Sequence, residues 1–495
     1  METIEKSRST KVIALSLGQT FTTLVLLIAG MFATRMLSKT DYATLRQTFI
    51  AYNFIAPLLM LGLPNALYYF LPRTETRKKT ITVENMLLLA ILSLIFSAFM
   101  LLGGYKYLAL RFNNIELVNT LKWMIGYPLY VMPIAIISAV LVIKGKTILL
   151  SLYNAITSIV LLAGTIAGLY LTHSYTGPLI AQIFLPILFF PVALVLIFKN
   201  VPGRIEKLER SSMSAMLKYA APLGLATMMG SLMLQLDKVI VSWMCLPEEF
   251  ANYVNGAIEI PLIGVITGSI STVLLSDMST LCFQKKENEA ILLFRKATQY
   301  SASILLPVMA FLVLTAKPFI VTLFSEKYTE SIAPFLIFLL IIPIRTVMYG
   351  SALMAIGKSK TILYRSFFDL LINLILSIIL IYFVGYLGAA IATIITLYAW
   401  TVPYNLYHIG KAFKVKPIHV LPLQLMMKIM VISILALIPA SVYLLFKNIL
   451  PPVFQLIIAA GIYFPIVFLV LYKKGYLYVP QQFEKYFAKI VTRKL

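Results

Sequence analysis

The sequence predicts an all-α integral membrane protein with about fourteen transmembrane helices. Of its 495 residues, 60% are hydrophobic and only 12% are charged, and the mean hydropathy is +0.91. A soluble chain of this length would carry far more charge on its surface. Apolar runs of about 20 residues, the length that crosses a bilayer core of about 30 Å, recur along the chain. No polar stretch is long enough for a separate soluble domain.

Each predicted span is an apolar run that ends at charged or turn-forming residues. The spans lie at approximately 12–37, 45–70, 84–108, 117–142, 147–171, 178–198, 214–244, 251–276, 296–316, 331–353, 361–384, 387–409, 422–446 and 452–472. Spans 2 and 8 contain helix breakers, with Pro57 and Gly62 in the first and Gly256 and Pro261 in the second. We therefore predict bent helices at these two matching positions.

Basic residues are concentrated in alternate loops. The chain has 42 Lys and Arg residues against 19 Asp and Glu, a formal net charge of +23. With the N-terminus placed inside, about 29 of the basic residues lie on the cytoplasmic side, as the positive-inside rule requires. Loop cations such as Lys144, Lys358 and Arg365 are among them. We predict that both termini are cytoplasmic, and we expect no nucleic-acid partner.

The chain contains an internal repeat. The hexapeptides at 144–149 and 358–363 share the pattern Lys-x-Lys-Thr-Ile-Leu. Segments that begin at Met36, Lys144 and Gly177 recur at spacings of 208, 214 and 211 residues (244 − 36, 358 − 144 and 388 − 177). Six spans separate the copies, so the halves share one orientation, related by a pseudo-two-fold axis along the membrane normal. Duplicated halves of this kind are typical of transporters.

The repeat also predicts how the chain is divided. The predicted parts are an N-terminal six-helix lobe at 1–205, a C-terminal six-helix lobe at 206–415, two additional helices at 416–472 and a cytoplasmic amphipathic tail at 473–495. In the tail, Phe483, Phe487 and Ile490 form an apolar helical stripe beside Lys485 and Lys489. This pattern suits a helix on the inner leaflet, with a solvated tail as the alternative.

The sequence indicates no enzyme. It has no glycine-rich loop followed by Lys-Ser/Thr, so we expect no nucleotide hydrolysis. His173, His408 and His419 are scattered near span ends, and no Ser/His/Asp or His/Glu cluster has catalytic spacing. Cys245 and Cys282 fall in loops on opposite membrane faces, with a spacing that binds no metal. We expect no catalytic residue, metal site or cofactor.

Ionisable side chains inside the spans are the candidate site residues. A charge at bilayer depth costs at least about 2.5–3.5 kcal/mol on insertion scales, so it needs a hydrated or paired environment. The cations are Arg345, Lys238, Arg46, Arg35 and Lys122, and the acids are Asp237, Glu259 and Asp369. One interpretation is a hydrated cavity between the halves, in which the cations bind a phosphate and the acids bind a coupling ion. The other is structural pairing between neighbouring helices.

Both interpretations stay open at this stage. Asp237 and Lys238 point about 100° apart on a helix, so they need not pair with each other. Arg345 has no acid nearby in its own helix, which favours a binding role. Arg35 and Arg46 lie close enough to a span end to snorkel toward the interface.

Several stretches resemble the polysaccharide-type (Wzx-type) flippases. Residues 237–241 (Asp-Lys-Val-Ile-Val), the acidic turn that follows and residues 250–253 (Phe-Ala-Asn-Tyr) are similar to the span 7–8 signature of that family. The family usually has Gly-x-Tyr in this turn, and residues 250–253 depart from that pattern. The resemblance covers essentially the whole chain. The same superfamily holds multidrug and toxin exporters and lipid II flippases.

The resemblance implies a flippase of the bacterial cytoplasmic (inner) membrane. Such a protein moves an undecaprenyl-diphosphate-linked oligosaccharide, an O-antigen or capsule repeat unit, from the inner to the outer leaflet by alternating access. Coupling to a proton or sodium gradient, or to the membrane potential, is implied as well. The expected partners are the lipid-linked oligosaccharide, membrane lipid, and the polymerase and glycosyltransferases of the pathway, and we expect a monomer.

Two alternatives compete with this prediction. A multidrug-type cation antiporter on the same fold would need an acidic, aromatic cavity, whereas the candidate residues include more cations than acids. A membrane glycosyltransferase or polymerase would need an outer loop with catalytic acids. The longest predicted outer loop, at 317–331, has only Glu326 and Glu330.

Overall fold

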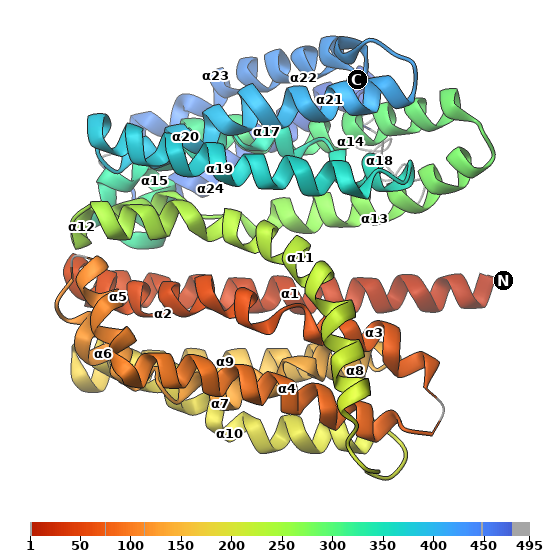
Figure 1. The fold of residues 1–495 in the computed structure, drawn as a ribbon. Coiled ribbons are helices and arrows are strands. Elements are labelled where there is room, and N and C mark those ends of the chain that lie inside the picture. Colours follow the sequence, from red (N-terminus) through yellow and green to blue (C-terminus); the bar gives the residue numbers. More distant parts are fainter. Residues whose placement is uncertain (1, 75, 113, 447–448, 478–495) are drawn as a thin grey trace. The chain divides into compact units, whose positions relative to one another are not determined.

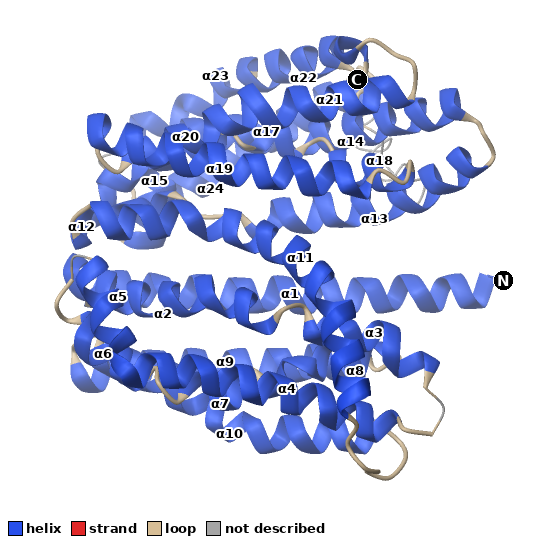
Figure 2. Cartoon of the chain, in the orientation of Figure 1, coloured by secondary structure: helices blue, strands red, loops and turns tan. Residues whose placement is uncertain are grey.

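The computed structural model describes residues 2–74, 76–112, 114–446 and 449–477. Over these ranges every regular element is a helix and no strand occurs (Figure 2). The predicted all-α class is therefore confirmed. Most of the predicted tail at 473–495 lies outside the described residues and stays a prediction.

The chain divides into two compact units, Met1–Ala251 and Asn252–Leu495 (Figure 1). The first unit contains α1 (Glu2–Met36), α2 (Lys39–Met60), α3 (Leu63–Arg73), α4 (Lys78–Phe99), η1 (Met100–Gly104), α5 (Tyr105–Arg111), α6 (Leu117–Trp123), α7 (Tyr127–Val131), η2 (Pro133–Ile136), α8 (Ile137–Ile143), α9 (Thr147–Thr172), α10 (Thr176–Asn200) and α11 (Arg210–Met244). Helix α12 (Pro247–Gly256) crosses the boundary between the units.

The second unit continues with helices of similar length. They are α13 (Pro261–Phe283), α14 (Glu287–Leu314), α15 (Ala316–Phe324), η3 (Glu326–Ser331), α16 (Ile332–Leu339), α17 (Ile342–Arg345), α18 (Tyr349–Ala355), α19 (Ser359–Val384), α20 (Leu387–Ile395), η4 (Thr396–Thr401), α21 (Val402–Ala412), η5 (Pro417–His419), α22 (Leu423–Leu435), α23 (Leu437–Ala440), η6 (Ser441–Phe446) and α24 (Pro452–Lys473).

Each unit has its own apolar core. In the first, Leu67 of α3, Leu89 of α4 and Ile197 of α10 belong to one buried cluster, which also includes Met216 of α11. Helix α11 packs on α2, α3 and α4 within this unit. In the second, buried residues of α13, α14, α18 and α21 form another cluster. The predicted lobe boundaries at 205 and 415 remain predictions.

The helices have the length and composition of membrane spans. Eleven helices in the described part of the chain are long and apolar enough to cross a membrane, or twelve if the bent pair Glu326–Leu339 and Ile342–Ala355 is one span. The predicted spans at 12–37 and 214–244 include residues whose side chains the structure does not describe. The total of about fourteen therefore stays a prediction.

The two predicted helix breaks are confirmed. Helix α2 ends at Leu61 and Gly62, both in the left-handed region with φ of 47° and 72°, and α3 starts immediately afterwards with Pro64 in its first turn. Helix α12 ends at Gly256, and α13 begins again at Pro261. Residues 257–260 are not helical, so Glu259 lies in the break and not two turns into a helix, as the sequence prediction placed it.

The repeat is visible in two matching turns, but in a different register. Gly145 and Gly357 have φ of 69° and 71°, and each is followed by a lysine that precedes a long helix. The lysine N–H groups donate to equivalent carbonyls, Lys146 to Leu141 at 2.8 Å and Lys358 to Leu353 at 2.9 Å. The turns are therefore 212 residues apart (357 − 145), and the hexapeptide alignment at 214 is shifted by two residues.

Candidate functional site

The most deeply buried of the predicted acids, Asp369, belongs to a polar cluster inside the second unit. Its side chain is 1% exposed, and its Oδ2 lies 3.2 Å from Arg365 Nε one turn earlier on α19. Its other oxygen, Oδ1, accepts a hydrogen bond of 2.7 Å from Thr401 Oγ1. An i,i+4 ion pair on one helix face and a hydroxyl from a second helix thus offset the free-energy cost of burying this carboxylate.

A π-helical turn shapes the other side of this cluster. The turn η4 interrupts the run from α20 to α21, and Thr401 is its last residue. Such turns add one residue to a helical turn and occur often at functional sites. Four residues later, Asn405 is fully buried, with Oδ1 3.5 Å from Arg365 Nη1. Its Nδ2 has no hydrogen-bond partner in the described chain, which leaves one donor open inside the cluster.

We call Arg365, Asp369, Thr401 and Asn405 the Asp369 cluster. The sequence prediction included only Asp369 and counted Arg365 among the loop cations. The structure places Arg365 inside α19, two turns from the helix start. The Arg-x-x-x-Asp spacing was the signal that could have found it. Thr401 and Asn405 carry no comparable signal, because their contacts with Asp369 and Arg365 depend on how η4 and the start of α21 pack on α19.

A second pair joins two predicted site residues of the same unit. Arg345, the last residue of α17, lies with Nη2 3.5 Å from Glu259 Oε1 in the break before α13. The side chains are 47% and 64% exposed, respectively, so the ion pair is weak and solvated. The prediction that Arg345 has no acid nearby in its own helix holds, and its partner Glu259 comes from a distant part of the chain.

The third pair lies on α11 in the first unit. Lys238 Nζ is 3.5 Å from Asp237 Oδ1, and Asp237 is almost fully buried. The flexible lysine stem bridges the angle between adjacent helix positions, so the two side chains do pair. Nearby, Gln47 Nε2 of α2 donates to Ser242 Oγ at 3.0 Å and fastens this part of α11 to α2.

The remaining cations are exposed on three separate elements of the first unit. Arg35 near the end of α1 donates from Nη1 to the Met31 carbonyl at 2.8 Å. Arg46 is exposed on α2 between buried neighbours. Lys122 on α6 lies with Nζ 5.5 Å from the centre of the Tyr105 ring. Their proposed role in binding an anion stays a prediction.

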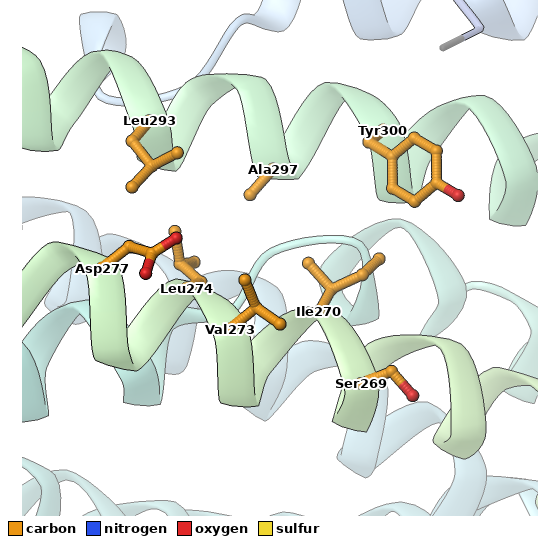
Figure 3. Close-up of a pocket in the computed structure, with 8 residues that line it drawn as sticks. All are labelled: Ser269, Ile270, Val273, Leu274, Asp277, Leu293, Ala297 and Tyr300. Atoms are coloured by element: carbon orange, nitrogen blue, oxygen red, sulfur yellow. The ribbon is translucent and has the colours of Figure 1, made fainter. Parts of the chain in front are cut away.

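A partly open cavity of about 340 Å³ lies between α13 and α14 (Figure 3). Its walls are mostly apolar, and Figure 3 shows Leu293, Ala297 and Tyr300 on one helix facing the residues of the other. Asp277 stands at one end of the cavity and makes no ion pair within the described ranges. Asp277 lies inside α13, one residue beyond the predicted span at 251–276, and was not among the sequence candidates.

The comparisons with known proteins agree with this architecture. The chain is similar in structure to a lipid II flippase MurJ in an inward closed conformation, with a TM-score of 0.72, 20% identity, and coverage of 93% of this chain and 99% of the other. It is also similar to a multidrug resistance MATE family transporter of the MOP superfamily in its inward-facing conformation, with a TM-score of 0.66 and 16% identity. That match covers 82% of this chain and 99% of the other. A MOP superfamily transporter from Pyrococcus furiosus matches with a TM-score of 0.60 and 15% identity, over 83% of this chain and 96% of the other. No curated protein sequence matches the chain.

The fold and the charged spans define a multi-pass membrane protein with the fold shared by MurJ and MATE transporters. The family described as "Polysaccharide biosynthesis protein" matches residues 32–333, which is more than half of the sequence. The chain belongs to this family. The resemblance is therefore confirmed at the level of this polysaccharide biosynthesis family, and the fold is the one shared with MurJ.

Proposed function

We propose that the protein is a flippase for an undecaprenyl-diphosphate-linked oligosaccharide, an O-antigen or capsule repeat unit. It moves this lipid from the cytoplasmic to the outer leaflet of the bacterial inner membrane by alternating access. Membership of the polysaccharide biosynthesis family and the fold shared with a lipid II flippase support the proposal. Both termini are cytoplasmic in this proposal, the chain acts as a monomer, and the polymerase and glycosyltransferases of the pathway are its partners.

The observation that carries the proposal is the distribution of accessible charge in the spans. Arg35, Arg46, Lys122 and Arg345 are exposed, whereas Asp237 and Asp369 are buried beside a cation. Accessible arginines in a membrane protein suit a diphosphate, because a guanidinium can bind phosphate oxygens bidentately. They also offset the cost of moving that charge out of water.

The buried acids are the proposed coupling residues. In the Asp369 cluster, a proton or a sodium ion that bound Asp369 would compete with Arg365 and so loosen the contact between α19 and η4. Asp237 on α11 is the corresponding candidate in the first unit, with Lys238 as its competing cation. Glu259 is a weaker candidate because it is exposed and already paired with Arg345.

Export in cells tests the function. In cells that lack their own flippase for a given repeat unit, the protein should restore surface polysaccharide, and Arg345→Ala should reduce it. Arg111→Ala removes another exposed arginine, which stacks on Tyr107 at 5.3 Å outside the proposed site, and should leave export unchanged. If the wild-type protein restores no surface polysaccharide for any repeat unit tried, the proposed substrate is wrong.

A second candidate function, a multidrug-type cation antiporter, is favoured by one observation. The cavity between α13 and α14 combines apolar walls, the ring of Tyr300 and the carboxylate of Asp277, which suits an organic cation. Ethidium efflux that depends on Asp277 would support this function. We expect instead that Asp277→Asn leaves both ethidium efflux and polysaccharide export unchanged.

A further inference from the structure

Two helices of the first unit present polar and aromatic side chains on neighbouring exposed faces. On α3 the exposed residues follow helical spacing, namely Asn65, Tyr68, Tyr69, Pro72 and Arg73, while the opposite face is buried. On α11, Lys218 and Tyr219 are exposed beside them. An apolar span that exposes such a face at its end is suited to an aqueous or head-group environment and not to hydrocarbon.

A close contact between glycines brings these two helices together. A Cβ on Gly62 would lie 2.7 Å from Gly224 Cα, and a Cβ on Gly224 would lie 2.2 Å from the Leu61 carbonyl carbon. Only glycine at both positions permits this close approach. The positive φ of Gly62 is a second reason for glycine at that position. The approach sets α3 against α11 closely enough for their tyrosines to stack.

The stack fixes the orientation of an arginine. The rings of Tyr69 and Tyr219 are 4.4 Å apart between centres, with planes 26° from parallel. The Arg73 guanidinium carbon lies 3.8 Å from the centre of the Tyr69 ring. Because both groups are at stacking distance, they occupy opposite faces of Tyr69. Arg73 Nη1 also donates to the Tyr69 carbonyl at 3.1 Å, which holds the guanidinium in place.

One edge of this guanidinium is left open. The Nε and Nη2 groups of Arg73 make no hydrogen bond or ion pair within the described ranges. These two parallel donors have the spacing that binds two phosphate oxygens at once. The chain has no acid between Tyr42 and Thr74 or between Arg210 and Leu236, and the next acid after Arg73, Glu75, lies outside the described residues.

We propose that Tyr69, Arg73, Lys218 and Tyr219, which we call the Tyr69 surface, form the entry site for the diphosphate of the lipid-linked substrate. This inference rests on the proposed function. Arg73 is the last residue of the candidate span Lys39–Arg73, and the ends of spans are where lipid head groups meet a membrane protein. Arg73 binds the phosphate, Lys218 adds positive charge, and the two tyrosines are positioning residues that hold Arg73.

Binding of undecaprenyl diphosphate tests the inference. The full-length protein is placed in nanodiscs of neutral phosphatidylcholine, and binding of added undecaprenyl diphosphate is followed by native mass spectrometry. Arg73→Ala should weaken binding by about tenfold or more, as expected for the loss of a charged bidentate contact. Arg73→Lys should weaken it almost as much, because lysine keeps the charge but lacks the planar fork.

The tyrosines separate positioning from a general structural effect. Tyr69→Phe keeps the ring and should bind like the wild type, whereas Tyr69→Leu should lose affinity although its thermal unfolding midpoint is unchanged. Arg111→Ala is the matched control, since it removes an exposed arginine that also lies over a tyrosine ring. It should have no effect on binding.

Each contrary result has its own meaning. If the wild type binds undecaprenyl diphosphate and Arg73→Ala binds it equally well, the Tyr69 surface is not the entry site, while the proposed function stands. If the wild type does not bind it at all, the proposed function and this inference both fail. In nanodiscs that contain anionic phosphatidylglycerol, displacement of undecaprenyl diphosphate from the wild type would assign Arg73 to bulk lipid head groups and overturn the inference.

Discussion

Two arginines of this chain, Arg77 and Arg365, each bind a buried carboxylate, but their surroundings differ. Arg77 precedes α4 and lies 3.2 Å from the fully buried Glu84, 3.5 Å from Glu206 and 2.8 Å from Glu209. Glu84 also accepts hydrogen bonds from the Glu209 N–H at 2.9 Å and from Ser212 Oγ at 2.5 Å.

The Asp369 cluster around Arg365 is less complete. It has one carboxylate, its hydroxyl partners are Thr401 and Ser366, and it retains the open Nδ2 donor of Asn405 in the described structure. A fully satisfied polar network stabilises one arrangement, whereas a network with an open group can exchange partners. Arg77 therefore holds the segment 201–212 on α4. We propose that the Asp369 cluster, in contrast, changes state during transport.

The largest predicted effect is on stability at Arg77. Arg77→Ala should lower the free energy of unfolding by about 2–4 kcal/mol, because it leaves Glu84 buried without its cation. The half-exposed Glu206 and Glu209 keep the loss below that of a fully buried network. Thermal unfolding in detergent measures it, with Arg204→Ala in the same segment as the control. Equal unfolding midpoints for Arg77→Ala and Arg204→Ala would show that Arg77 does not hold the segment 201–212 on α4.

The glycine contact should produce the next largest loss. Gly224→Ala places a methyl group against the Leu61 carbonyl carbon and should cost about 1–3 kcal/mol. The control is Gly461→Ala, since nothing lies within 4 Å of a Cβ at Gly461, and that variant should be neutral or slightly stabilising. If the losses of Arg77→Ala and Gly224→Ala add up in the double variant, two independent contacts hold α11. A loss at Gly461 equal to that at Gly224 would contradict the steric account.

Asp369→Asn tests whether the Asp369 cluster acts in transport. The amide keeps the size of the side chain and can still accept from Thr401 Oγ1, so the unfolding midpoint should change little. Export should nevertheless fall about tenfold, or about 1.4 kcal/mol, because the ionisable group is gone. Glu289→Gln removes an exposed acid at the start of α14 and should export normally. Normal export by Asp369→Asn would show that the cluster only joins helices.

The smallest predicted effect is on stability at the exposed pair. Glu259→Gln should change the free energy of unfolding by no more than about 1 kcal/mol, since solvated ion pairs contribute little. A larger loss, measured by the same thermal unfolding, would mean that the Arg345–Glu259 pair stabilises the fold as the Arg77 network does.

The sequence predicted the spans well and the site partners poorly, for a physical reason. Hydropathy marks a span directly, so the limits of α9, α10 and α19 follow from it. The helix breaks near Gly62 and Gly256 follow from local glycine and proline residues. Ion pairs such as Arg345 with Glu259 depend on contacts between distant segments, which no local pattern encodes. The one local signal is the position of Arg365 four residues before Asp369, and it is hidden when Arg365 is counted as a loop cation.

Flipping in a purified system tests the central claim most directly. The full-length protein is reconstituted into liposomes that contain an undecaprenyl-diphosphate-linked oligosaccharide, and the fraction that a membrane-impermeant glycosidase can reach is followed over time. We predict that the wild-type protein makes the lipid from both leaflets accessible and that Asp369→Asn does so about tenfold more slowly. Accessibility equal to that of protein-free liposomes would contradict the account.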